Sequence, residues 1–112
     1  MQEYERRAIE KMHIIKRAKL IEFWEKKENN GSESVLDAWY RTMKKGSFEN
    51  IAQIREFYRH ADIIGECLVF NVGTNKYRVV TKIYFTEQTL LIRFVMTHKE
   101  YDKNAWKKDC ER

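Results

Sequence analysis

Residues 67–96, "CLVFNVGTNKYRVVTKIYFTEQTLLIRFVM", decide the fold class of this 112-residue chain. They contain three runs rich in β-branched and aromatic residues, at 67–72, 76–85 and 90–96. Short polar turns separate the runs: "GTN" supplies a glycine suited to positive φ, and "TEQT" follows the second run. The alternation has a period of two, which predicts an antiparallel meander of three strands.

The residues before this meander have a helical period instead. Residues 16–28, "KRAKLIEFWEKKE", predict one helix, with Asn30 and Gly31 as a left-handed C-terminal cap. A second helix follows, in which Ser34 and Asp37 resemble a capping box. Its apolar residues form the clearest helical stripe in the chain: Val35, Leu36, Trp39, Tyr40 and Met43. A third, shorter helix should begin after the cap residue Asn50, and residues 59–66 should be irregular.

Together these elements predict an α+β domain with N-terminal helices packed on a small antiparallel sheet. The apolar stretch "MHII", residues 12–15, predicts a short strand that joins this sheet at an edge. Residues 1–11 carry balanced charges and almost no apolar face, so we interpret them as an N-terminal extension. Residues 12–112 should form a single domain.

The composition favours anionic partners without naming one. The net charge is +5 and the pI is about 9.2, values that an ordinary basic globular domain also has. No run approaches the roughly 18 apolar residues of a membrane span, and the N-terminus has no signal-peptide core. We therefore expect a cytoplasmic protein with no membrane partner, in which Cys67 and Cys110 are reduced thiols.

Several function classes lack their motifs here. The chain has no glycine-rich nucleotide-binding motif and no G-x-S-x-G motif. Its histidines and cysteines do not have the spacing of metal ligands, so we expect neither a metal nor another cofactor.

The second and third strands of the meander carry a basic face. If the turn centres on Glu87 and Gln88, Lys82 lies opposite Arg93 and Arg78 lies opposite Thr97. Arg78, Lys82 and Arg93 then share one face. The other face, which should cover the helices, carries Tyr77, Val79, Ile83, Leu90, Ile92 and Phe94. Like charges that face each other destabilise a sheet, so either these side chains splay into water or an anion lies between them.

The basic face leads into "MTHKEYD", residues 96–102, which adds His98, Lys99 and Tyr101. Cleavage of RNA by internal attack requires removal of the 2′-OH proton, stabilisation of charge on the phosphate, and protonation of the leaving oxygen. Histidine exchanges protons near neutral pH, arginine binds phosphate oxygens, and tyrosine stacks on bases or donates a proton. The predicted surface holds all of these groups and requires no metal. A lone histidine after a strand, however, is more commonly only a surface residue.

Two segments, "VFNVGTNKYRVV" (69–80) and "IRFVMTHKEYDK" (92–103), closely resemble the HigB toxins of bacterial toxin–antitoxin modules. "MHII" and "DAWYRTMKKGSFENIAQIREFY" (37–58) also look like that family. Because HigB toxins are similar in fold to the RelE and ParE toxins, the resemblance implies helices on a curved antiparallel sheet. It also implies a metal-independent, ribosome-dependent mRNA endonuclease that inhibits translation. A HigA-type helix-turn-helix antitoxin would neutralise it, and the toxin would reach operator DNA only through that antitoxin.

The resemblance also implies roles for individual residues. Arg78 matches the strand arginine at the scissile phosphate, and His98 and Tyr101 lie where residues after the last strand complete the catalytic site. Lys76 and Lys99 match basic positions of the family, and we predict that they bind RNA. For Lys82 and Arg93 the same prediction comes from their place on the basic face of the sheet. Two alternatives stay open: a ParE-like toxin that poisons DNA gyrase without nuclease activity, and a nucleic-acid-binding domain with no activity. A gyrase poison would not need a proton-transfer group beside the strand arginine.

Overall fold

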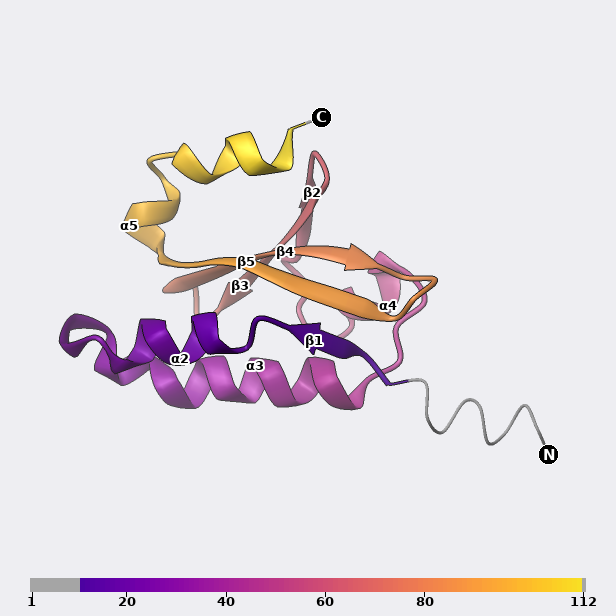
Figure 1. The fold of residues 1–112 in the computed structure, drawn as a ribbon, viewed down its shortest axis with the longest axis horizontal. Coiled ribbons are helices and arrows are strands. Elements are labelled where there is room, and N and C mark those ends of the chain that lie inside the picture. The colour runs from indigo at the N-terminus through magenta and orange to yellow at the C-terminus, as the bar shows by residue number, and fades with distance from the viewer. Residues whose placement is uncertain (1–10, 112) are drawn as a thin grey trace.

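The computed structural model describes residues 11–111, which form helices and strands in a mixed order (Figure 1). The predicted extension, residues 1–11, therefore lies outside the described residues except for Lys11. The elements, of which η1 and η2 are 3₁₀ helices, are β1 (His13–Ile15), α2 (Ala18–Glu25), η1 (Lys27–Ser32), α3 (Glu33–Lys45), α4 (Ile51–Arg55), β2 (Asp62–Ile64), β3 (Cys67–Val72), β4 (Tyr77–Tyr84), β5 (Thr89–Thr97), α5 (His98–Tyr101) and η2 (Ala105–Cys110). Across residues 11–111, no helix is both long enough and apolar enough to cross a membrane.

The five strands form one sheet in the order β1-β5-β4-β3-β2. Strands β2 to β5 are antiparallel neighbours, which confirms the predicted meander, and β1 lies at the predicted edge. β1 pairs with β5 in parallel, with His13 beside Thr89, so the sheet is mixed rather than purely antiparallel. The prediction of irregular structure for residues 59–66 was wrong over Asp62–Ile64, which pair with β3 as β2. The α+β class is confirmed.

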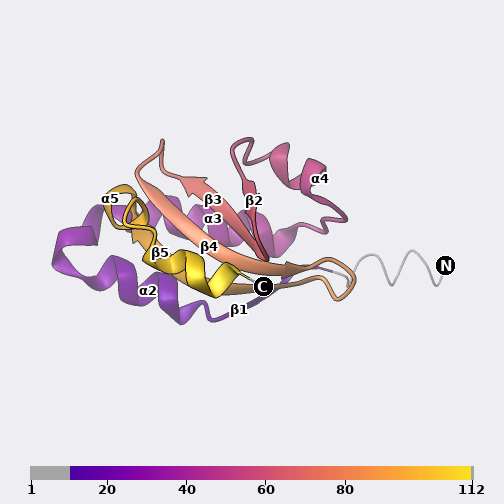
Figure 2. The same ribbon diagram turned by 90° about the horizontal axis from the view of Figure 1, so that it is seen from above.

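Helices α2 and α3 cover one face of the sheet (Figures 1 and 2). The predicted stripe of α3 is buried at Leu36, Trp39 and Met43, and the Trp39 ring packs edge-on against Phe70 of β3, with centroids 5.1 Å apart. Burying a large apolar side chain contributes roughly 1.5–3 kcal/mol. This layer supplies the main core and leaves the opposite face of the sheet for other elements.

The caps predicted between the first two helices were wrong. Asn30 and Gly31 lie inside η1 without positive φ, because the chain passes from α2 through η1 directly into α3. The N-cap of α3 is Ser32, not Ser34. Asp37 lies 2.8 Å from Arg41 instead of capping the helix.

The other predicted caps and turns are confirmed. The side chain of Asn50 caps α4 by accepting a hydrogen bond from the backbone N–H of Gln53, at 3.0 Å. Gly73 has φ +72° in the turn between β3 and β4.

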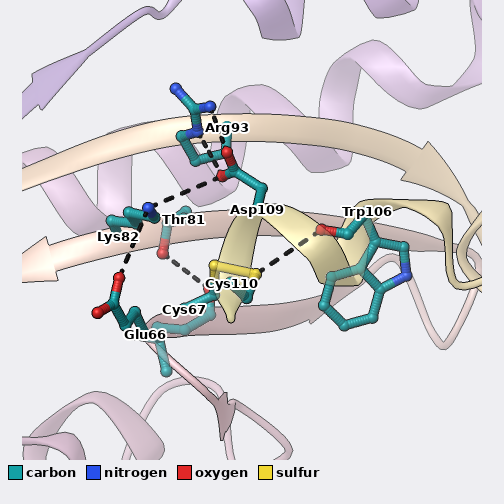
Figure 3. The surroundings of a disulfide bond; sticks show 9 residues. Glu66, Cys67, Thr81, Lys82, Arg93, Trp106, Asp109 and Cys110 are labelled. Carbon is teal, nitrogen blue, oxygen red and sulfur yellow. Dashed lines mark hydrogen bonds and ion pairs between the residues drawn. A yellow bond between two sulfur atoms is a disulfide. The ribbon is translucent and has the colours of Figure 1, made fainter. Parts of the chain in front are cut away.

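The C-terminal segments α5 and η2 cover the opposite face of the sheet, where a second apolar cluster forms (Figure 2). Its buried members are Cys67, Val69, Val80, Trp106 and Cys110. Cys67 and Cys110 form a disulfide, with Cα atoms 5.2 Å apart (Figure 3), so the prediction of reduced thiols was wrong. It relied on their separation of 43 residues and on the absence of an export signal, whereas η2 folds back onto β3 and brings the two sulfurs together.

Removing this disulfide should lower the free energy of unfolding by about 2–4 kcal/mol, because a crosslink over a loop of this length restricts the unfolded chain. We expect the Cys67→Ser/Cys110→Ser variant to unfold at a lower urea concentration than the oxidised protein. The control is reductant, which should lower the midpoint of the wild-type protein and leave that of the double variant unchanged. A wild-type midpoint insensitive to reductant would contradict this role for the disulfide.

Candidate functional site

The register of β4 and β5 differs from the predicted one. Arg78 lies opposite Met96, and Lys82 lies opposite Leu91. The predicted partners were Thr97 for Arg78 and Arg93 for Lys82. They lie one and two residues further along β5, respectively, so both predicted pairings were wrong. The main reason is the position of the turn: Tyr84 pairs with Thr89, so the turn centres on Thr86 and Glu87 rather than on Glu87 and Gln88. An irregularity in the ladder between Val80 and Thr81 then reduces the difference from two residues at Lys82 to one at Arg78.

This irregularity has the form of a β-bulge on β5. Val80 pairs with Phe94 and Thr81 pairs with Ile92, which leaves Arg93 without a partner in the ladder. The extra residue places Phe94 with the second apolar cluster rather than on the helix-covered face, so its predicted position was wrong. The other five predicted members of the helix-covered face do belong to the main core.

Arg93 and Lys82 converge on one anion, and it belongs to the protein. The Nε and Nη2 atoms of Arg93 donate to the Asp109 carboxylate at 2.7 and 2.6 Å. The Lys82 ammonium lies 4.0 Å from Asp109 and 3.9 Å from Glu66 (Figure 3). The hydrogen bonds from Arg93 lower the pKa of Asp109, against the effect of burial, and Asp109 raises the pKa of Arg93. These two predicted RNA-binding residues therefore fasten η2 to the sheet.

We expect Asp109→Asn to make stability less dependent on pH. Because the folded-state pKa of Asp109 is depressed, its ionised form stabilises the fold above the unfolded pKa of about 3.9. That contribution is lost as the pH falls through the lower folded-state pKa. Urea unfolding between pH 7 and pH 2.5 should show the wild-type protein losing its advantage over the variant in the acidic range.

The matched control for this prediction is Asp62→Asn. The Asp62 side chain is 67% exposed and lies 3.8 Å from Arg55, so its ion pair should contribute little. The Asp62 variant should follow the wild-type pH profile. If the free energies of unfolding of the wild-type protein and the Asp109 variant changed in parallel with pH, a stabilising role for ionised Asp109 would be contradicted.

Arg78 differs from Lys82 and Arg93 because its hydrogen-bond partners are neutral groups. Its Nη1 donates to Asn71 Oδ1 at 3.2 Å, and its Nη2 donates to Asn75 Oδ1 at 2.7 Å. Backbone carbonyls of Asn75 and Tyr77 accept further, longer hydrogen bonds at 3.4 and 3.3 Å. The residue is only 9% exposed, and no carboxylate of the described residues lies within ion-pair distance of it. A cation held in this way keeps its charge available for an anionic ligand.

The ring of Tyr101 lies against the guanidinium of Arg78, with 5.1 Å between Cζ and the ring centroid. Tyr101 in turn stacks on Trp106, with ring centroids 4.6 Å apart, and the Trp106 indole donates to the Tyr101 carbonyl at 2.9 Å. Burial raises the pKa of Tyr101, although the Arg78 charge acts in the opposite direction. The phenol therefore stays protonated at neutral pH and can donate a hydrogen bond.

His98 begins the single turn of α5, where a capping box fixes the backbone. Thr97 Oγ1 accepts from the Glu100 N–H at 3.1 Å, and Glu100 Oε1 accepts from the Thr97 N–H at 2.9 Å. The backbone N–H of His98 donates to the Lys76 carbonyl at 2.9 Å, which ties α5 to the turn before β4. The half-exposed imidazole has Nδ1 3.4 Å from Asp102 Oδ2, so Nε2 is the ring nitrogen that a substrate can meet.

His98 and Tyr101 are three residues apart in one helical turn, a spacing that places both side chains on one side of α5. Lys76 and Lys99 are exposed beside them, on the turn before β4 and on α5. The predicted residues therefore separate into a group around Arg78 and the ion-paired Lys82 and Arg93. Within the part of the chain that the structure describes, no cluster of three or more His, Cys, Asp or Glu could hold a metal ion.

The sequence interpretation missed the residues that hold this site together. Asn71 and Asn75 flank the turn in "FNVGTN", a segment that predicted a hairpin and carried the family resemblance, but neither asparagine was given a role. Their position across a tight turn from Arg78 was the available signal. Asp102 and the stacking of Trp106 on Tyr101 had no signal in the local pattern.

Comparison with known proteins shows the family of this chain. Residues 32–104 match the HigB toxin family, described as the RelE-like toxic component of a toxin–antitoxin system. The mRNA interferase toxin HigB of Escherichia coli K12 is 37% identical over 94 residues, which cover 81% of this chain and 88% of that protein. The mRNA interferase HigB of Escherichia coli O6:H1 is 30% identical over 95 residues, or 82% and 90% of the two chains. The chain therefore belongs to the HigB family of RelE-like toxins.

Proposed function

We propose that this toxin is an mRNA interferase, an endoribonuclease that cuts mRNA on the ribosome and so inhibits translation. The observation that carries the proposal is Arg78, a nearly buried cation whose described partners are all neutral, next to a tyrosine and one helical turn that begins with a histidine. The names of the relatives, all mRNA interferases, support the same activity. They do not favour a gyrase poison.

The proposed reaction needs only groups of this chain. His98 Nε2 takes the proton of a ribose 2′-OH, and the resulting oxygen attacks the adjacent phosphorus. Arg78 stabilises the additional negative charge on the phosphate oxygens. The bond to the 5′-oxygen breaks, and the protonated Tyr101 hydroxyl supplies a proton to that oxygen. The products are a 2′,3′-cyclic phosphate and a 5′-hydroxyl, and no metal or other cofactor takes part.

The exposed lysines serve a different purpose in this proposal. Lys76 and Lys99 contact RNA phosphates beside the site, where they attract the strand without taking part in proton transfer. The predicted RNA contacts of Lys82 and Arg93 stay a prediction, and their ion pairs with Asp109 leave them less charge to offer a phosphate.

Dependence on the ribosome follows from the weak positive charge. A net charge of +5 supports few phosphate contacts, so the domain should bind free RNA poorly. The ribosome would supply the alignment of the strand for attack. The proposed location is accordingly the cytoplasm, where translation takes place.

The neutralising partner is proposed to be a HigA-type helix-turn-helix antitoxin. An acidic segment of such a partner would complement the exposed lysines near the site. Any contact of the toxin with operator DNA would pass through this antitoxin.

The test is primer extension on mRNA from cells that express the toxin with and without its antitoxin. We expect discrete cuts within translated codons only when the toxin is expressed alone, together with growth arrest. Purified toxin should cut mRNA on programmed ribosomes and leave the same naked RNA nearly intact. Growth arrest with intact mRNA and damaged DNA would instead support gyrase poisoning.

A further inference from the structure

A cleft opens beside the two asparagines that hold Arg78. It has a volume of about 470 Å³ and is lined by His60, Asn71, Thr74 and Asn75. Two of these residues, Asn71 and Asn75, are the amides that hold the Arg78 guanidinium. The cleft is therefore contiguous with the proposed phosphate site, and its volume lies within the usual range for ligand pockets of about 300–1,000 Å³.

The lining of this cleft is polar and carries no acidic side chain. Asn75 Oδ1 already accepts hydrogen bonds from Arg78 and from the Asn71 amide, at 2.7 and 3.2 Å. Among the hydrogen bonds of residues 11–111, none uses the Nδ2 group of Asn75 or the hydroxyl of Thr74. Both groups can donate to a ligand, and the exposed imidazole of His60 offers a flat ring on which a base can stack.

We infer that this cleft binds the nucleobase next to the phosphate that Arg78 holds. The inference rests on the proposed function and adds a base-recognition site to it. His60 stacks on the base, while Asn75 Nδ2 and the Thr74 hydroxyl donate to acceptor atoms on its edge. Because Arg78 and Asn71 already donate to Asn75 Oδ1, the Asn75 side chain can contact the base only as a hydrogen-bond donor. Bases with exposed acceptors, such as guanine with O6 and N7, fit this pattern better than the adenine edge, which carries a donor beside an acceptor.

The first experiment measures single-turnover cleavage on ribosomes programmed with mRNA that carries one abasic nucleotide, placed in turn at each codon position. At the position that occupies the cleft, loss of the base should slow the wild-type protein by about 5- to 150-fold, the effect of one base stacked on an aromatic ring. His60→Ala should slow cleavage of intact mRNA by a similar factor and should lose less than the wild-type protein on the abasic mRNA, because its stacking contribution is already absent.

Two matched variants separate stacking from other roles of His60. His60→Phe keeps a flat ring without a titratable group and should restore most of the rate. His13→Ala removes another exposed histidine, on β1 at the opposite edge of the sheet, and should cut like the wild-type protein. Equal slowing of His60→Ala and His60→Phe, or additive effects of His60→Ala and the abasic nucleotide, would overturn the inference.

The second experiment does not depend on cleavage. Trinucleotides with 2′-O-methyl groups cannot be cut, and their titration into the wild-type toxin can be followed by NMR. The His60 ring and the Asn75 side-chain amide should shift together with Arg78. If they shift in a toxin that cuts no mRNA, the proposed function fails and the base site stands. If Arg78 shifts while His60 and Asn75 do not, the base site is wrong.

Discussion

Arg78→Ala should slow single-turnover cleavage on programmed ribosomes by about 10²–10³-fold, since it removes the charge that stabilises the transition state at the phosphate. Arg78→Lys should stay impaired, because a single ammonium cannot satisfy both Asn71 and Asn75 and still present a planar donor pair to the phosphate. Any displacement of the lysine ammonium from the phosphate would lower the cleavage rate of Arg78→Lys further.

In the structure, Arg78→Ala should lower the free energy of unfolding by more than the sequence suggests. From the sequence, Arg78 belonged to an exposed face, where substitutions cost within about 0.5 kcal/mol. Its burial and its hydrogen bonds to the two asparagines raise the expected loss for Arg78→Ala to about 1–2 kcal/mol. Urea unfolding must therefore accompany the kinetics, and rates are compared only where both proteins are folded.

Arg41→Ala is the matched control for charge. Arg41 lies on α3, is 71% exposed, and is separated from Arg78 by the sheet. Its removal lowers the net charge equally and should leave the cleavage rate unchanged. If a folded Arg78→Ala variant cuts near the wild-type rate, Arg78 is not the phosphate-binding group.

His98→Ala should slow cleavage by about 10²–10⁴-fold, the usual contribution of a side chain that transfers a proton. The side chain is 46% exposed, and its described ion pair with Asp102 is also exposed, so the free energy of unfolding should hardly change. Asp102→Asn should have a smaller effect on rate, because Asp102 only orients the imidazole.

Added imidazole gives this prediction a second readout. It can enter the space left by His98→Ala and should restore part of the rate, while Arg78→Ala should not respond. His13→Ala serves as the control for loss of an exposed histidine. A folded His98→Ala variant with wild-type rate would place the proton transfer on another group.

Elements with a strong internal period were predictable from the sequence. The α3 stripe and the β3–β5 meander each repeat over many residues, and burial of one face requires that repeat. By contrast, β2 has three residues, two of them exposed, and exists because its backbone pairs with β3. No period is available in so short a strand.

The sequence indicated candidate residues for the site but not the partners that hold them. The chemistry available at Arg78, His98 and Tyr101 can be inferred from their residue types. The position of a β-bulge at Arg93, by contrast, depends on how all of β4 and β5 pair. The partners also separate the basic residues: Asp109 neutralises Arg93 and Lys82, whereas Arg78 has neutral partners. The disulfide and the Tyr101–Trp106 stack also depend on where η2 folds back, which no local pattern specifies.

The parallel pairing of β1 with β5 sets an order of assembly during protein synthesis. His13 leaves the ribosome early, yet its neighbour in the sheet, Thr89, is made near the end of the chain. Tyr101, which lies against Arg78, Trp106, which stacks on Tyr101, and the disulfide-bonded Cys110 follow later still. A nascent chain therefore lacks the complete sheet and the surroundings of Arg78 until the residues as far as η2 have left the ribosome.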